Sequence, residues 1–275
     1  MKAKTIVTAN GFAHSEDGDA GTFVPDPGNG QEVLRRLARR AAGLSGADIE
    51  RLVREARQAA RRARRPLAHA DLEALLAGAR PTKSPAMRHR IAVHEAGHVL
   101  ARLLHRVGTI SLVTIEGLDG QGYVESIMND DAVDTQERCL AMLGVYLAGR
   151  VAEQVVFGAT LSGSGGSERS DLARATALAY AMEASLGFGT EMPLLYRDIA
   201  DQHAALRFDP GLARRVNARL ETAQADVCRL IGRNRRRLNT IAETLLQHGT
   251  LEGRELAALV ANLALPDRDA CGNKP

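Results

Sequence analysis

Two histidines and a glutamate occur at a spacing that can bind a metal ion. His94, Glu95 and His98 form the pattern His-Glu-x-x-His. Residues four apart on an α-helix lie on one face, so both imidazoles can reach one ion. Neutral imidazole nitrogens suit Zn²⁺, and the adjacent glutamate can accept a proton from a water that the metal activates. The pattern therefore indicates metal-assisted hydrolysis, with His94 and His98 as ligands and Glu95 as the general base.

The same residues could instead lie on a helix that binds no metal. The surrounding residues, such as Val93, Val99 and Leu100, are strongly apolar, which predicts a buried or half-buried helix. Buried imidazole and carboxylate groups need partners, and a metal ion supplies one. We therefore favour a metal site, and we expect His105 to be a residue of the helix end and not a further ligand.

A catalytic zinc site needs a third protein ligand, because a fourth position must stay open for water. The candidates are carboxylates on other predicted helices: Glu153, Glu168, Asp171 and Glu183. Asp171 comes where a Gly/Ser-rich loop enters a helix, which would fix its side chain firmly. An ordinary N-cap role fits that position equally well. Spacing alone therefore leaves the third ligand open.

The elements that hold these residues are predicted to be mainly helical. Of the 275 residues, 45% are apolar but only 3% are aromatic, so aliphatic side chains on helices must fill the core. The metal motif falls on a predicted helix over 88–105. A β-hairpin follows, with strands over 109–115 and 123–127. Further helices are predicted over 135–156 and 171–185, from Asp209 onward with a break near 232–235, and from Thr250.

The N-terminal part reads as a separate small unit. A strand over residues 4–8 and irregular chain precede a short helix that starts at residue 31 and ends at Gly43. Ser45 and Asp48 form a capping box that opens a second helix. Pro66 stops that helix, and a third one follows over 67–76. A proline-containing linker over 80–84 then separates this unit from the metal motif.

Composition argues against several classes of protein. The net charge is only +3, and the arginine-rich stretch over 51–65 has no interleaved aromatic residues, so nucleic-acid binding is not expected. The three cysteines are far apart, which suits a reducing cytoplasm better than a disulfide framework. The sequence contains no run of about 18 apolar residues, so we do not expect a membrane span. The sequence also lacks a GxxxxGK[ST] loop for nucleotide phosphates.

Several segments, in order, resemble one family, the FtsH-type AAA zinc proteases. His94–His98 resembles the family's HEAGH motif, and 148–158 resembles its GGRAAEE…FG helix. Ser170–Thr176 resembles the NDI-x-x-AT segment, whose aspartate is the family's third zinc ligand. Further matching segments are 186–189 with Pro193 and Leu194, 234–246, 250–253 and, for the lid of the family's ATPase module, 43–49. The resemblance covers roughly residues 35–260.

The resemblance implies a mainly α fold: a helical zinc-peptidase domain over 81–265 with a small β-hairpin. A helical AAA lid over 31–80 precedes it, with an irregular segment over 1–30 and a tail over 266–275. It implies Zn²⁺ bound by His94, His98 and Asp171, with Glu95 as general base, and it makes Glu153 a supporting residue. The loop before Asp171 is longer than is usual in the family. Asp171 is preferred over Glu168 because Ala175-Thr176 keeps the family spacing.

The expected function is a zinc metalloendopeptidase that hydrolyses unfolded or extended polypeptides within an ATP-dependent quality-control protease. Substrate would pair with the strand at Gly122, Tyr123 and Val124. The resemblance also implies a homohexamer, while the ATPase core is absent from this sequence. We expect a cytoplasmic location, with any membrane association supplied by a part outside this chain. The alternative is a non-catalytic assembly or adaptor subunit that keeps the lid and the helical scaffold.

Overall fold

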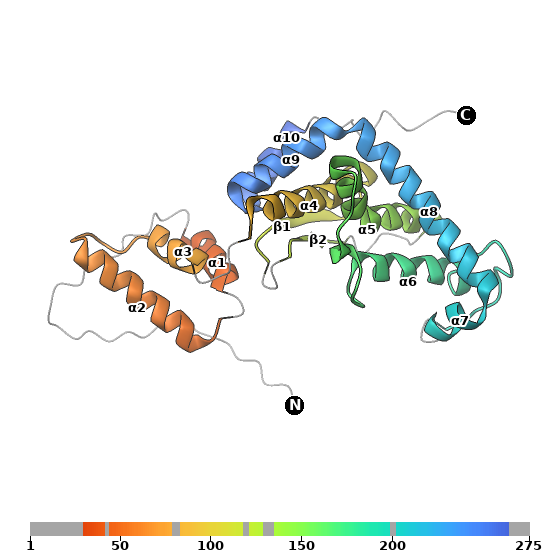
Figure 1. Cartoon of the computed structure of the whole chain (residues 1–275), viewed down its shortest axis with the longest axis horizontal. Helices are drawn as coiled ribbons and strands as arrows, with labels where there is room; N and C mark the ends of the chain where they lie inside the picture. The colour runs from red at the N-terminus through yellow and green to blue at the C-terminus, as the bar shows by residue number, and fades with distance from the viewer. Residues whose placement is uncertain are drawn as a thin grey trace. The chain divides into compact units, whose positions relative to one another are not determined.

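The computed structural model describes residues 30–41, 44–78, 83–117, 121–128, 135–198 and 202–263. The chain divides into two compact units, residues 1–82 and 83–275, whose elements are labelled in Figure 1. The predicted strand over 4–8, Gly43 and most of the 80–84 linker lie outside the described residues.

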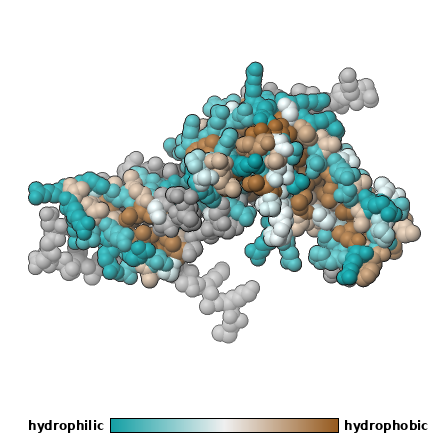
Figure 2. All heavy atoms as spheres, in the orientation of Figure 1, coloured by the Kyte–Doolittle hydropathy of each residue, from teal (hydrophilic) through white to brown (hydrophobic). Residues whose placement is uncertain are grey.

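The first unit contains α1 (Gly30–Ala41), α2 (Gly46–Arg62) and α3 (His69–Gly78), with α3 packed against both of the others. The predicted capping box opens α2: Ser45 Oγ accepts a hydrogen bond from the Asp48 amide, and the Asp48 carboxylate accepts one from the Ser45 amide. Hydrophobic residues lie at the middle of this unit with hydrophilic ones around them (Figure 2). The sequence-predicted helical unit is therefore present.

The second unit is built on helices and one small sheet. In chain order its elements are α4 (Pro85–His105), β1 (Thr109–Thr114), β2 (Tyr123–Ile127), α5 (Gln136–Phe157), a 3₁₀ turn at Ser162–Ser164, α6 (Asp171–Ala184), α7 (Gln202–Phe208), α8 (Pro210–Arg233), α9 (Arg235–His248), β3 (Thr250–Glu252) and α10 (Gly253–Asn262). The mainly α fold with a hairpin is confirmed, as is the break between α8 and α9.

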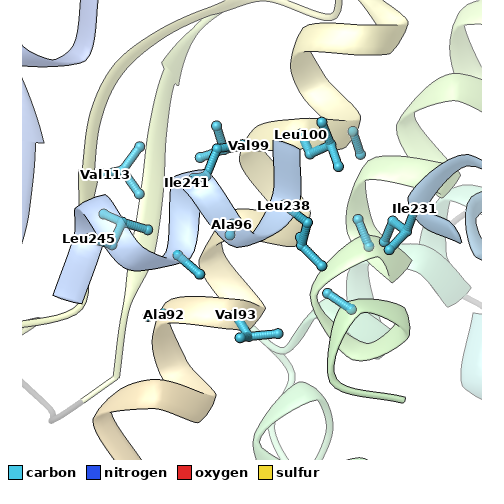
Figure 3. Close-up of a cluster of buried hydrophobic side chains, with 14 of the residues drawn as sticks. Ala92, Val93, Ala96, Val99, Leu100, Val113, Ile231, Leu238, Ile241 and Leu245 are labelled. Atoms are coloured by element: carbon cyan, nitrogen blue, oxygen red, sulfur yellow. The ribbon is translucent and has the colours of Figure 1, made fainter. Parts of the chain in front are cut away.

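Helix α4 lies at the centre of this unit and packs against α5 and α9 (Figure 1). Figure 3 shows its apolar face, with Ala96 and Val99 among the side chains that meet Ile241 and Leu245 of α9. On the side of α5 the approach is closer. A Cβ on Gly97 would come within 2.5 Å of the Ala148 carbonyl oxygen. This close packing fixes the faces that α4 and α5 turn toward each other.

The described strands form one antiparallel sheet in the order β2-β1-β3. The third strand corrects one prediction: Thr250 does not begin a helix. Thr250–Glu252 pairs with Leu112–Thr114 of β1, and the helix begins at Gly253. A three-residue strand is too short to show an alternating pattern, so its pairing with β1 decides its conformation. Helix α7 was not predicted either.

Helix α5 is long and apolar enough to span a membrane by length and composition alone. Half of its most apolar window is buried inside the unit, against α4, α6 and α8. Because its buried residues include Glu153, we assign it to the core of this unit.

Candidate functional site

The predicted metal motif lies in the middle of α4, on the side that meets α5 and α6. Ser84 caps the start of α4, and Arg106, in the left-handed region, ends it, so the histidines lie well inside regular helix. His98 is buried and His94 is half-buried. The (i, i+4) spacing therefore brings both imidazoles to one place, as the sequence predicts.

Asp171 is brought to the same place from α6. The N-cap of this helix is Ser170, whose Oγ accepts a hydrogen bond from the Ala173 amide at 3.3 Å. The capping role that the sequence left open for Asp171 therefore belongs to its neighbour. As the first helical residue, Asp171 turns its carboxylate to the histidines.

Three potential ligand atoms form a nearly equilateral triangle. His94 Nε2 and His98 Nε2 are 3.1 Å apart, and Asp171 Oδ2 is 3.2 Å from each of them. Two ligand atoms each about 2.0–2.1 Å from a tetrahedral zinc ion lie about 3.3 Å apart. The triangle therefore has the size that a zinc ion requires, with one tetrahedral position left over.

The outer nitrogens of the imidazoles show why a cation fits. His94 Nδ1–H donates to Glu153 Oε1 at 2.7 Å, and His98 Nδ1–H donates to the Val145 carbonyl at 2.8 Å. With their protons held there, both rings in the neutral form turn lone pairs inward, toward each other and toward a carboxylate oxygen. Three acceptors that converge without a donor need a positive charge between them, and a metal ion supplies it.

The electrostatics agree with this arrangement. Burial lowers the pKa of His94, but hydrogen bonds to Asp171 and Glu153 outweigh it and raise the pKa to about 10. Burial raises the pKa of Asp171, yet its contacts with both imidazoles hold the pKa well below its usual range. Without a metal, a proton on His94 thus takes the place of the cation, and a metal ion must displace it.

The other candidate carboxylates lie outside this cluster. Glu153 Oε1 accepts from His94, and its Oε2 accepts from the Leu161 amide at 2.9 Å, so both oxygens are used to orient the site. Glu183 is buried and pairs with Arg219 and, at 3.3 Å, with Arg215 of α8. Glu168 is exposed. Asp171 is thus the carboxylate that the fold places against both histidines.

Two glycines leave space for the site, and the sequence pattern did not predict this role for either of them. A Cβ on Gly149 of α5 would lie 2.5 Å from His98 Nε2 and closer still to His94 Nε2. A Cβ on Gly122 would lie 2.5 Å from Glu95 Cγ and 2.6 Å from its Oε1. The family-like motif around Gly149 was the available signal. Only packing shows which side chains a larger residue would displace.

The site opens into a cleft of about 680 Å³. Glu95 lines it beside both histidines, and burial raises the pKa of the Glu95 carboxyl, with the two imidazoles opposing that effect. Gly122, Tyr123 and Val124 form part of the wall, so the strand residues predicted to contact substrate do reach the cleft. A buried carboxylate with a raised pKa next to a metal position is suited to accept a proton.

Comparison with known proteins identifies the family of this chain. The model of peptidase family M41 matches residues 81–259, and an AAA+ lid domain matches residues 32–74. The chain is 32% identical over 255 residues to the ATP-dependent zinc metalloprotease FtsH of Chloroflexus aggregans, covering 82% of this chain and 38% of that protein. The FtsH protein of Thermus thermophilus is 31% identical over 255 residues, covering 84% and 40%.

This chain therefore spans about two fifths of the length of these curated relatives. The matched parts are the lid and the peptidase, in the order that the structure shows them. The chain belongs to peptidase family M41, as an FtsH-type protease domain preceded by an AAA+ lid.

Proposed function

We propose that this chain is a zinc endopeptidase that hydrolyses unfolded or extended polypeptides. The observation that carries the proposal is the triangle of His94 Nε2, His98 Nε2 and Asp171 Oδ2, which has the size of a zinc site and lies open to a cleft beside Glu95. When bound there, zinc would polarise the scissile carbonyl and lower the pKa of water to near 7. The relatives named above are zinc metalloproteases by name, which supports this choice of metal.

Glu95 is the proton carrier in this proposal. Its carboxylate accepts the proton of the attacking water and later delivers it to the amine that leaves. Gly122, just before β2, packs against the Glu95 side chain where any Cβ would collide, so the chain at Gly122 limits the room for the carboxylate on that side. Burial raises the pKa of Glu95, which strengthens it as a base once it is ionised.

Strand β2 is the proposed binding surface for the substrate backbone. Among the described strands it pairs only with β1, so its other edge keeps unpaired backbone groups beside the cleft. An extended peptide can add to such an edge through main-chain hydrogen bonds. Because those bonds ignore most side chains, this mode suits broad cleavage of unfolded chains.

The wider setting is also a proposal. The relatives are called ATP-dependent, so we propose that an ATPase module delivers polypeptides to this peptidase. We also propose that the peptidase works in the cytoplasm and assembles as a homohexamer. Light scattering of the purified chain gives its mass directly: a hexamer is expected, and a monomer at all concentrations would contradict the assembly.

The function is tested by zinc content and casein hydrolysis of the chain beside Glu95→Gln and His98→Ala. We expect about one zinc per chain, loss of zinc in His98→Ala, and retention of zinc without hydrolysis in Glu95→Gln. Zinc without hydrolysis in the unaltered chain would mean that the peptidase needs its ATPase module or its hexameric assembly for activity. A folded chain that binds no zinc would overturn the proposal and favour the assembly or adaptor role.

A further inference from the structure

Beyond the metal position, the cleft contains the positive side chain of Arg102, two of whose nitrogens have no hydrogen-bond partner among the described residues. Arg102 lies one helical turn after His98 on α4 and lines the same cleft. Its Nε and Nη1 atoms are buried, and neither donates a hydrogen bond. A buried guanidinium whose N–H groups lack acceptors is costly, so this position calls for an acceptor that the described part of the chain does not provide.

A second arginine, Arg174, lies close enough to Arg102 to act on it electrostatically. Burial lowers the pKa of Arg102, and the guanidinium of Arg174 on α6 lowers it as well, against opposing effects of Tyr146 and Asp171. Asp171 directs its Oδ2 to the two imidazoles at 3.2 Å. Among the described residues, neither arginine forms an ion pair with a carboxylate. The part of the cleft past His98 on α4 therefore carries two arginines that have no carboxylate ion-pair partner among the described residues.

The position of Arg102 sets what can reach it. Four residues along a helix correspond to about 6 Å, and one residue of an extended peptide to about 3.3 Å. A polypeptide cleaved at the metal position would therefore bring its second residue, on one side of the scissile bond, close to this guanidinium. A guanidinium binds carboxylates through paired N–H donors, so the matching group on a polypeptide is a carboxylate.

We propose that Arg102, with Arg174 beside it, binds a carboxylate of the polypeptide substrate within about two residues of the scissile bond. This inference rests on the proposed function, since it takes a polypeptide as the occupant of the cleft. The carboxylate comes either from an aspartate or glutamate side chain or from the C-terminus of the substrate. The peptidase thus combines main-chain binding at β2 with selection for negative charge.

The test measures binding apart from hydrolysis, in the zinc-loaded Glu95→Gln chain. A fluorescent peptide carries Glu or Gln in turn at each of three positions on either side of one cleavable bond. A second pair lacks acidic side chains and ends in a free carboxylate or an amide. At the best position, the peptide with the carboxylate is expected to bind at least about tenfold more tightly than its neutral match.

Adding Arg102→Met is expected to bring that ratio close to one. Methionine replaces an unpaired buried charge with an apolar chain of similar length, so the variant should unfold at no lower temperature than its parent. Arg174→Met, at an exposed position, provides a second variant with an expected two- to fivefold decrease in the ratio, about that of an exposed charge. Arg169→Met is the matched control: Arg169 lines the same cleft and is exposed, and its removal should leave the ratio unchanged.

A ratio near one before any arginine is changed would overturn the inference. The inference would also be overturned if the affinity ratio stayed the same in Arg102→Met and Arg174→Met. The same holds if Arg169→Met decreased the ratio as much as Arg102→Met does. Hydrolysis by the chain with Glu95 intact separates this inference from the proposed function. Carboxylate-selective binding by a folded chain that neither holds zinc nor cleaves would contradict the function alone, whereas cleavage without selectivity would contradict this inference alone.

Discussion

Gly149 of α5 and His94 of α4 face each other so closely that no side chain fits between them. A Cβ at position 149 would collide with His94 Nε2 and would lie 2.5 Å from His98 Nε2. The space that this glycine leaves is the space into which both candidate ligand atoms point. Helix packing, and not the His-Glu-x-x-His motif alone, therefore creates the room for a metal ion.

Gly149→Ala is expected to decrease zinc affinity at least about 100-fold, because the added methyl group displaces one or both imidazoles. Helix formation should not suffer, since alanine has the higher helix propensity. Titration with a zinc indicator gives the affinity, and circular dichroism checks the fold. Gly163→Ala adds the same methyl group in the cleft wall where nothing lies within 4 Å, so it should bind zinc normally. Equal affinity in both variants would contradict this account.

Gly122→Ala is expected to affect the reaction and not the metal. The added Cβ overlaps the Glu95 side chain, whereas His94 and His98 are not among its nearest neighbours. Moving a general base by about 1 Å can cost about 100-fold in rate, so kcat should fall by about that factor with zinc content unchanged. Single-turnover hydrolysis of a peptide, with zinc measured on the same sample, decides the matter. Loss of zinc in this variant would show that Gly122 supports the metal site instead.

Glu153→Leu is expected to decrease zinc affinity about 10- to 100-fold, because His94 loses the acceptor that holds its ring. Glu153→Gln keeps an oxygen that can accept this hydrogen bond, so its zinc affinity should decrease less than that of Glu153→Leu. The matched control is Glu183→Gln, which changes another buried helical carboxylate, one paired with Arg215 and Arg219. Competition with a chelator of known zinc affinity measures the zinc affinity of all three variants. If Glu183→Gln were as damaging as Glu153→Leu, general destabilisation would explain both.

The binding of zinc should release protons. In the metal-free chain the pKa of His94 is raised from 6.5 to about 10, so at pH 6.5–7 the folded chain carries a proton that zinc must displace. Zinc affinity therefore rises with pH over this range. Calorimetry in two buffers of different ionisation enthalpy should give at least about one proton released per zinc. A binding heat that does not depend on the buffer would contradict the protonated state of His94.

The same shift makes the stability of the metal-free chain depend on pH. The folded pKa of His94 is above its unfolded value, so its contribution is fully present below pH 6.5 and is lost as pH rises through about 10. The free energy of unfolding should therefore decrease between pH 7 and pH 10. Urea unfolding at several pH values measures this, and His94→Gln should flatten the curve in that window. A decrease of the same size in the variant would assign the effect to other groups.

The sequence by itself determined the local features of this protein. The period of apolar residues located α4, α5 and α6, the capping box located the start of α2, and the four-residue spacing put His94 and His98 on one helix face. Each of these features depends on interactions within a few residues along the chain. The family motifs then supplied the order of the lid and the peptidase.

Only the tertiary structure decided how distant residues meet. Asp171 is 73 residues beyond His98, and its place beside both imidazoles depends on how α4, α5 and α6 pack. The same packing makes Glu153 a hydrogen-bond partner of His94, leaves two Arg102 nitrogens without a partner among the described residues and pairs Thr250 with β1. Close-packed side chains set these contacts, and no repeat in the sequence encodes which surfaces of two helices will touch.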